Sequence, residues 1–161
     1  MNRSIFKTAG LALSAAVLSL AMAQAAPYAA GSKVESFTAK TQHEKAYVFK
    51  PADTRFLLVS HDMETGKKAN AVLTTVGPEN LSNKKVVYLA NIHGMPGVGR
   101  MFALPKMRKY SHTIILGDDA ALIAKFPEQK NKVTVLKLAG GKVSSVQYWS
   151  PGAEPLDGFL K

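Results

Sequence analysis

Two His-x-Met triplets hold the side chains of this sequence that are best suited to chemistry. They run from His61 to Met63 and from His93 to Met95, each directly after an apolar run typical of a strand. Imidazole and thioether groups are ligands that suit copper, Cu(I) above all. If the two runs are neighbouring strands, the triplets predict a copper site with the ligands His61, Met63, His93 and Met95. The alternative is that both methionines fill the core near the strand ends.

A glycine-rich segment from Gly94 to Gly99 follows the second strand-like run. Loops that cradle phosphate lie between a strand and a helix, so the segment allows a flavin or nucleotide site as an alternative cofactor role. Its G-x-x-G-x-G spacing differs from the G-x-G-x-x-G of dinucleotide folds, and the Lys-Ser/Thr pair of a P-loop is missing. A turn that needs a positive φ is the favoured interpretation.

The remaining candidates have structural explanations. Asp118-Asp119 follows a strand-like run, and we expect a turn there rather than an acid-base or calcium pair. His43 and His112 have no Ser or Asp partner at the spacing of a hydrolytic triad. Tyr148 and Trp149 end a strand-like run and are expected to cover the core rather than to stack on a ligand. No catalytic residue is predicted.

Cysteine is absent from all 161 residues. Thiol exchange requires a thiolate, so the chain can perform none and can form no disulfide. We therefore expect no thiol-disulfide oxidoreductase activity. The folded state is expected to rest on its hydrophobic core alone, even in a compartment that permits disulfides.

The N-terminus has the pattern of a secretory signal peptide. A basic start precedes an apolar stretch from Ala9 to Ala23, and small residues flank Gln24. An uncleaved membrane anchor is the alternative, but the stretch is short for a bilayer span and is followed at once by Gln24 and Pro27. We expect residues 1–25 to be removed and residues 26–161 to form one domain in the periplasm. After this cleavage the protein is not expected to be an integral membrane protein.

The chain is basic, with 21 Lys and Arg against 11 Asp and Glu, a formal net charge of +10. Removal of Arg3 and Lys7 with the signal peptide leaves 19 against 11, or +8. A solvated basic surface is the simplest explanation. An exported basic protein also has anionic envelope material, such as phospholipid or lipopolysaccharide head groups, within reach, so we expect an anionic envelope component or an envelope protein as partner. The lysines are scattered rather than gathered with aromatic residues, and no nucleic-acid binding is expected.

Strand and helix patterns alternate along the mature chain. Apolar runs predict strands at 46–50, 54–60, 86–92, 113–116, 132–138 and 142–149, the last two joined in a hairpin by Gly140-Gly141. Helical spacing predicts helices at 65–76, 120–126 and 151–160, and a short helical or irregular segment at 101–110 interrupted by Pro105. This order predicts a single α/β domain with a central mixed sheet flanked by helices.

Three segments carry a resemblance to a known family. TGKKANA at Thr65 to Ala71, PGVGRMF at Pro96 to Phe102 and VTVLKLAGGKV at Val133 to Val143 are similar to the YtfJ family of periplasmic, thioredoxin-like proteins. The resemblance extends from about Gly31 to the C-terminus. It implies a thioredoxin-like fold of the peroxiredoxin or thiol-reductase type, with which the order of elements agrees, and a periplasmic location. The family supplies no catalytic residues.

This resemblance also locates a missing redox site. Aligning Val72 and Leu73 with the apolar pair in the first helix of a thioredoxin puts Met63 to Gly66 where Cys-x-x-Cys would lie. Val133 then stands where a cis-proline would lie. Both features are absent, which implies that the site has been dismantled. We expect a binding or interaction module on a redox-silent scaffold, with a cofactor-binding protein as the alternative.

Overall fold

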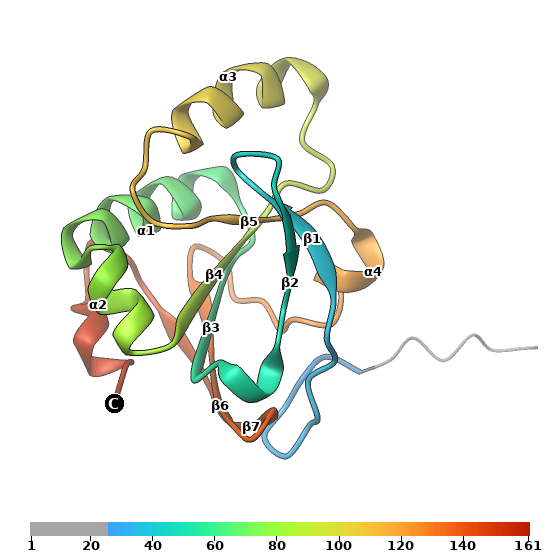
Figure 1. Ribbon diagram of the computed structural model, residues 1–161, viewed down its shortest axis with the longest axis vertical. Helices are drawn as coiled ribbons and strands as arrows, with labels where there is room; N and C mark the ends of the chain where they lie inside the picture. The colour runs from blue at the N-terminus through green and yellow to red at the C-terminus, as the bar shows by residue number, and fades with distance from the viewer. Residues whose placement is uncertain (1–25) are drawn as a thin grey trace, which may run out of the picture.

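One mixed sheet of seven strands forms the centre of the molecule (Figure 1). The computed structural model describes residues 26–161, and the predicted signal peptide, residues 1–25, lies outside the described residues. The strand order is β2-β1-β5-β4-β3-β6-β7. The strands are β1 (Thr38–Thr41), β2 (Ala46–Val48), β3 (Phe56–Ser60), β4 (Val86–Asn91), β5 (Ile115–Gly117), β6 (Val133–Ala139) and β7 (Lys142–Trp149). β3, β4 and β5 run parallel and the other pairs are antiparallel, which confirms the predicted mixed sheet.

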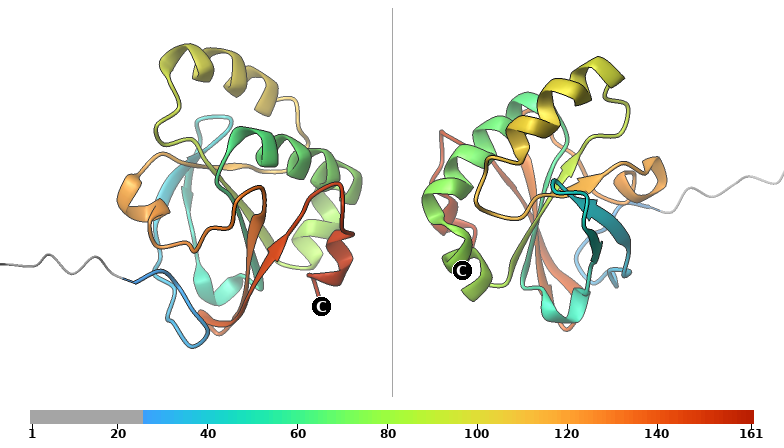
Figure 2. Two further views of the ribbon diagram at one scale, coloured as in Figure 1. Left: turned by 180° about the vertical axis from the view of Figure 1, so that it is seen from behind. Right: turned by 45° about the horizontal axis from the view of Figure 1, so that its top comes forward.

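Helices cover both faces of this sheet (Figure 1, Figure 2). The α-helices are α1 (Met63–Val76), α2 (Pro78–Asn83), α3 (Gly97–Met107) and α4 (Ala120–Ile123), and the 3-10 helices are η1 (Pro51–Asp53) and η2 (Leu156–Gly158). α1, α2 and η2 pack on one face, and α4 packs on the other together with the N-terminal segment. α3 lies beyond α1, at one extremity of the molecule in every view. Within residues 26–161, no helix has the length and apolar character needed to cross a membrane.

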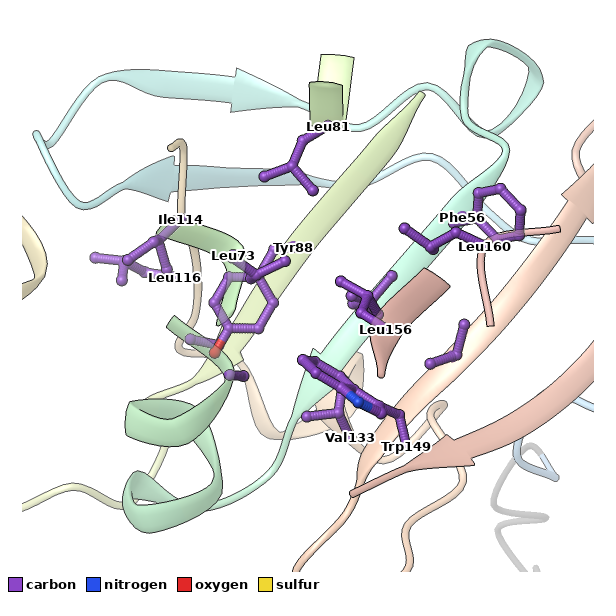
Figure 3. Packing of buried hydrophobic residues seen from close by; sticks show 14 of the residues in the cluster. Phe56, Leu73, Leu81, Tyr88, Ile114, Leu116, Val133, Trp149, Leu156 and Leu160 are labelled. Carbon is purple, nitrogen blue, oxygen red and sulfur yellow. The ribbon is translucent and has the colours of Figure 1, made fainter. Parts of the chain in front are cut away.

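The sheet separates two hydrophobic cores. β3 is buried along its whole length because both of its faces are covered, as its continuous apolar sequence predicts. Phe56 and Leu58 point into the core beneath α1, whereas Leu57 and Val59 alternate into the opposite core. Figure 3 shows the first core, in which Trp149 is fully buried, as expected for a residue that covers the core.

α1 begins where β3 ends, and its first turn packs closely on the sheet. Asp62 caps the helix, because its side chain accepts a hydrogen bond from the N–H of Thr65 at 2.8 Å. Gly66 permits the close approach, since a Cβ at this position would lie 3.2 Å from Ser60 Oγ. The helix ends at Gly77, whose φ of +82° is one that glycine adopts without strain. The carboxyl end of β3 therefore leads directly into a capped, closely packed helix.

Two helices depart from their predicted bounds. The sequence pattern stops at Gly77-Pro78, but Pro78 opens the additional helix α2. An N–H in the first turn has no acceptor within the helix, so proline, which lacks this group, loses no hydrogen bond at that position. α3 begins at Gly97 rather than at Met101, and it continues through Pro105, so the predicted interruption was wrong. The carbonyl that Pro105 leaves without a helical donor belongs to the exposed Met101, where solvent can satisfy it.

Other differences are smaller. β1 was not predicted, because its sequence TAKT lacks an apolar pattern. The strand predicted at 113–116 lies at Ile115–Gly117, and the helix predicted at 120–126 ends at Ile123. The helix predicted at 151–160 is reduced to η2, because Gly152 has a φ of +85° and the chain makes a bridge there instead of a helical turn.

Candidate functional site

A cavity of about 320 Å³ lies between α1 and α3, over the carboxyl ends of β3 and β4. Ligands of α/β proteins commonly bind at this end of parallel strands. Both helices and both strands contribute to the lining, together with the connections between them. The cavity therefore has the place and the composite origin of a binding site.

Two hydroxyl groups meet on the sheet side of the cavity. Ser60 Oγ of β3 and Tyr88 OH of β4 lie 2.8 Å apart and form a buried hydrogen bond. Burial raises the pKa of Tyr88, so its hydroxyl stays protonated at neutral pH. Gly66 of α1 lies against this pair, since a Cβ there would be 3.5 Å from Tyr88 OH. The pair gives the cavity a neutral hydrogen-bonding group in a mostly apolar surrounding.

Apolar and sulfur-containing side chains form much of the wall. Met63 comes from the first turn of α1, Met95 from the connection between β4 and α3, and Met107 from the end of α3. Unbranched methionine side chains adapt to ligands of different shape. Lys67 and Lys106 also contribute to the lining and are themselves exposed. The opening therefore carries two ammonium groups beside the exposed Asp62 carboxylate, while the interior is apolar.

The predicted copper ligands are divided between different surroundings. Met63 and Met95 both line the cavity, one from α1 and the other from the connection between β4 and α3. The His61 imidazole turns to β6 instead, with Nε2 3.0 Å from Thr134 Oγ1, and His93 is exposed. Within residues 26–161, no three His, Asp or Glu side chains gather as a metal-binding group. The cavity thus holds the methionine half of the predicted ligand set.

The His61 imidazole is held in its neutral form. Thr134 Oγ1 donates to the carbonyl of Pro127, so it accepts the hydrogen bond from His61 Nε2. The other ring nitrogen, Nδ1, lies 4.0 Å from Glu128 Oε2 and has no hydrogen-bond partner among the described residues. Burial lowers the pKa of His61, although the Glu128 carboxylate opposes this effect.

The segment from Gly94 to Gly99 is only partly a loop. Gly94 has a φ of +77°, which agrees with the favoured interpretation as a turn. Gly97 and Gly99, however, lie in the first turn of α3, so the turn does not extend over the whole segment. Gly99 is closely packed, since a Cβ there would lie 3.3 Å from Cγ of Met95. A flavin or nucleotide at this segment stays a prediction.

Arg100 fastens the start of α3 to the sheet. Its guanidinium contacts both carboxylate oxygens of Asp118 at 2.5 Å and donates to the carbonyls of Ile92 and Met95 at 3.1 Å. The hydrogen-bonded Arg100 lowers the pKa of the Asp118 carboxyl. Asp119 caps α4 by accepting from two backbone N–H groups of that helix. Asp119 thus accepts backbone N–H bonds as the sequence predicts, whereas Asp118 binds a side chain of α3 instead.

A buried polar cluster behind the cavity was not predicted. Asn70 of α1 lines the cavity, and its Oδ1 lies 2.9 Å from Nε2 of the buried His112. Gln42 donates to the His112 carbonyl and accepts from the N–H of Ile114. Burial lowers the pKa of His112 to about 4, so its ring is neutral. The side-chain contacts join residues 42 to 72 positions apart, a separation that no local sequence pattern reveals.

Comparison with known proteins identifies the fold but no family. No family model matches the chain, and no curated protein matches it in sequence. The crystal structure of the peroxidoxin BcpB from Mycobacterium tuberculosis matches with a TM-score of 0.57 and 12% identity, over 83% of this chain and 94% of that one. A peroxiredoxin-like protein from Aquifex aeolicus matches with a TM-score of 0.55 and 12% identity, over 85% and 86% of the two chains. A thio-disulfide isomerase from Thermus thermophilus matches with a TM-score of 0.52 and 18% identity, over 81% and 94%.

These similarities confirm the predicted thioredoxin-like fold. At such low sequence identity they extend to the fold alone. The chain shares the scaffold of thiol-disulfide oxidoreductases and peroxiredoxins, yet its sequence contains no cysteine.

Proposed function

We propose that this protein is an exported, periplasmic binding or interaction module on a thioredoxin-like scaffold, that it performs no thiol chemistry, and that its ligand site is the cavity between α1 and α3. We also propose that it belongs to the YtfJ family. Two of the segments that carry this resemblance, TGKKANA and PGVGRMF, lie in α1 and around the start of α3 and supply residues to the cavity wall. The family resemblance and the proposed site thus concern the same part of the molecule.

The position of the apolar cavity is the observation that carries this proposal. Met63 to Gly66, which the resemblance aligns with a redox motif, form the first turn of α1 and supply Met63 and Gly66 to the wall. Ligand pockets are mostly apolar, contain few polar groups and have volumes of about 300 to 1,000 Å³. At about 320 Å³ the cavity is at the small end of this range. It suits a small apolar molecule or the apolar end of a larger one.

The polar groups around the cavity support binding rather than catalysis. Tyr88 has a raised pKa and is engaged with Ser60, so it can donate or accept a hydrogen bond but is a poor nucleophile. Lys67 and Lys106 at the opening favour a ligand with an anionic group. An anionic envelope component or an envelope protein, the partners expected from the net charge, would meet these requirements.

A matched pair of substitutions tests the cavity. We expect the mature protein to bind the neutral apolar dye N-phenyl-1-naphthylamine, with a rise in dye fluorescence. Ala103→Phe fills the cavity from α3 and is expected to weaken dye binding by at least about tenfold. Ala71→Phe adds the same ring on the exposed side of α1 and should leave the affinity unchanged. Absence of dye binding by the wild type, or equal affinities of the two variants, would contradict the proposal.

Copper binding is a second candidate, favoured by the two thioethers in the cavity. Cu(I) accepts thioether ligands, and Met63 and Met95 are both available from the cavity wall. Titration with Cu(I) against a chromophoric chelator should then show one tight equivalent that Met63→Leu or Met95→Leu removes. Tight binding that also depends on His61 or His93 would support the full predicted ligand set. Copper binding without a defined stoichiometry would eliminate the candidate. Binding that is unaffected by Met63→Leu, Met95→Leu, His61→Ala and His93→Ala would eliminate it as well.

A further inference from the structure

The outward side of α3 exposes large apolar side chains. Val98 is 67% exposed, Met101 69% and Phe102 64%, and no residue of α3 is buried. Soluble proteins rarely leave such residues together without a partner. The exposed group lies on one short helix, so it forms a patch rather than a set of scattered residues.

Helical geometry separates this outward side from the side that faces the protein. Val98, Met101 and Pro105 recur three and four positions apart, so they form one stripe along the helix. Leu104 and Met107, on a different side, pack against the hydrophobic core. None of the three residues of this stripe lines the cavity, whereas the neighbouring Phe102 does. The stripe is open to solvent, since Val98 and Met101 are mostly exposed, and α3 stands at the extremity of the molecule (Figure 2).

Positive charge accompanies the stripe. From Gly97 to Lys109 the sequence GVGRMFALPKMRK contains only basic charges. Arg100 and Arg108 are paired with acidic residues of the β-sheet loops. Within residues 26–161, Lys106 and Lys109 form no ion pair, and both are exposed. An apolar stripe thus lies beside unneutralised ammonium groups at one end of a basic protein.

We propose that the outward side of α3 docks onto an anionic phospholipid bilayer. Interfacial helices bury apolar side chains at the boundary between head groups and acyl chains, and basic residues beside them attract anionic lipids. Val98, Met101 and Pro105 enter this boundary, while Lys106 and Lys109 contact lipid phosphate groups. The surface shares Lys106 with the cavity proposed above, whereas Val98, Met101, Pro105 and Lys109 lie outside the cavity wall.

Two features favour a bilayer over a protein as the occupant. The stripe is a protruding helix side, and a fluid lipid surface adapts to such a shape without a complementary groove. A second copy of this chain docked symmetrically would put two basic patches into one interface, because a two-fold interface uses the same patch on both subunits. The like charges oppose that arrangement, whereas an anionic membrane neutralises them.

Vesicle binding tests the proposal with one matched pair of valines. The mature protein is expected to sediment with phosphatidylglycerol vesicles and not with phosphatidylcholine vesicles at low salt. Val98→Glu should weaken partitioning by at least about tenfold. Val48→Glu makes the same change at a valine of β2 that is 54% exposed, and it should leave partitioning nearly unchanged. Both variants change the net charge equally. A difference between their vesicle partitioning therefore shows that α3, and not β2, contacts the bilayer.

A second pair separates charge at α3 from the general basicity of the protein. Lys109→Gln is expected to weaken binding about fivefold, as for one lysine near an anionic surface. Lys142→Gln, which removes an exposed lysine at the turn between β6 and β7, at the amino end of β3 and away from the cavity, should have a much smaller effect. Urea midpoints of all four variants establish that each one is folded under the binding conditions.

The outcomes are distinct. Stronger effects of the α3 substitutions than of their controls support the proposal. No sedimentation of the wild type with anionic vesicles overturns it. Equal effects of Val98→Glu and Val48→Glu also overturn it, and indicate unspecific attraction of a basic protein. A wild-type dimer that Val98→Glu converts to a monomer, without vesicle binding, assigns the surface to a second copy and overturns it as well.

Discussion

The pH dependence of stability tests whether His112 is buried as a neutral ring. Burial lowers its pKa from 6.5 to about 4, and a charged ring has no acidic partner in the cluster with Asn70 and Gln42. Above pH 6.5 the ring is neutral in both the folded and the unfolded chain, so its titration has no effect on stability. As the pH falls below 6.5, only the unfolded chain takes up the proton, and the free energy of unfolding decreases until the folded-state pKa is passed.

The difference between the two pKa values sets the size of this effect. The full shift corresponds to about 3 kcal/mol, of which about 2.5 kcal/mol is lost between about pH 7.5 and about pH 4.5. This is a large part of the typical stability of a domain, which is about 5 to 15 kcal/mol. Urea unfolding at both pH values measures the loss for the wild type.

The His112→Gln variant isolates the contribution of this ring. Glutamine can still donate to Asn70 Oδ1 but does not titrate, so the variant should lose about 2.5 kcal/mol less than the wild type over the same pH interval. The carboxyl groups and His61, whose pKa is also lowered by burial, titrate in both proteins and cancel in the comparison. Parallel pH profiles of the two proteins would refute the assignment of a buried, neutral His112.

Two further substitutions probe the first turn of α1. Gly66→Ala puts a methyl group 3.2 Å from Ser60 Oγ and 3.5 Å from Tyr88 OH, and the buried Ser60–Tyr88 hydrogen bond limits how far these groups can move. The overpacking costs about 1 to 3 kcal/mol and is partly offset by about 1 kcal/mol of helix propensity, so we expect a net loss of up to about 2 kcal/mol in urea unfolding together with weaker dye binding. A variant of unchanged stability and affinity would show that the turn can move aside. Asp62→Ala removes the helix cap that accepts from the N–H of Thr65, and it should cost about 1 kcal/mol, whereas Asp62→Asn should retain most of the stability. Equal losses in both Asp62 variants would mean that the charge, rather than the capping hydrogen bond, matters.

The strands of the central sheet were predictable because their residues carry the signal themselves. β3 and β4 are apolar over nearly their whole length, which is the consequence of helices on both faces of the sheet. The hairpin of β6 and β7 is specified by two glycines, both with positive φ. The parts that failed depend on context instead. Pro78 can stop or start a helix, and Pro105 is tolerated inside α3 because the residue four positions before it, Met101, is exposed and its carbonyl can bond to water.

The candidate site was predictable in place but not in composition. The resemblance pointed to the first turn of α1, and Met63 and Met95 were singled out by their positions after two strands, which do lie side by side. Tyr88 and Asn70 were missed, because an isolated polar residue in an apolar strand or helix does not reveal which distant residue it will contact. His61 and His93 follow the same strands, yet the direction of a side chain after a strand depends on the local turn. Such contacts are determined only when the whole fold is assembled.

α3 links the proposed roles, because it forms one wall of the cavity and carries the exposed stripe. None of its residues is buried, and polar contacts hold its two ends. Arg100 binds Asp118 near the start, and Arg108 donates to the Gln42 carbonyl and to Glu44 after the end. A helix with no buried residue, held by these polar contacts and by the partly buried Leu104 and Met107, belongs to the less stable part of a fold, and it can gain burial when a ligand or a surface covers it. Catalysis, in contrast, requires groups fixed within a fraction of an ångström on rigid elements. The way α3 is attached therefore favours binding over catalysis at the cavity beside the first turn of α1.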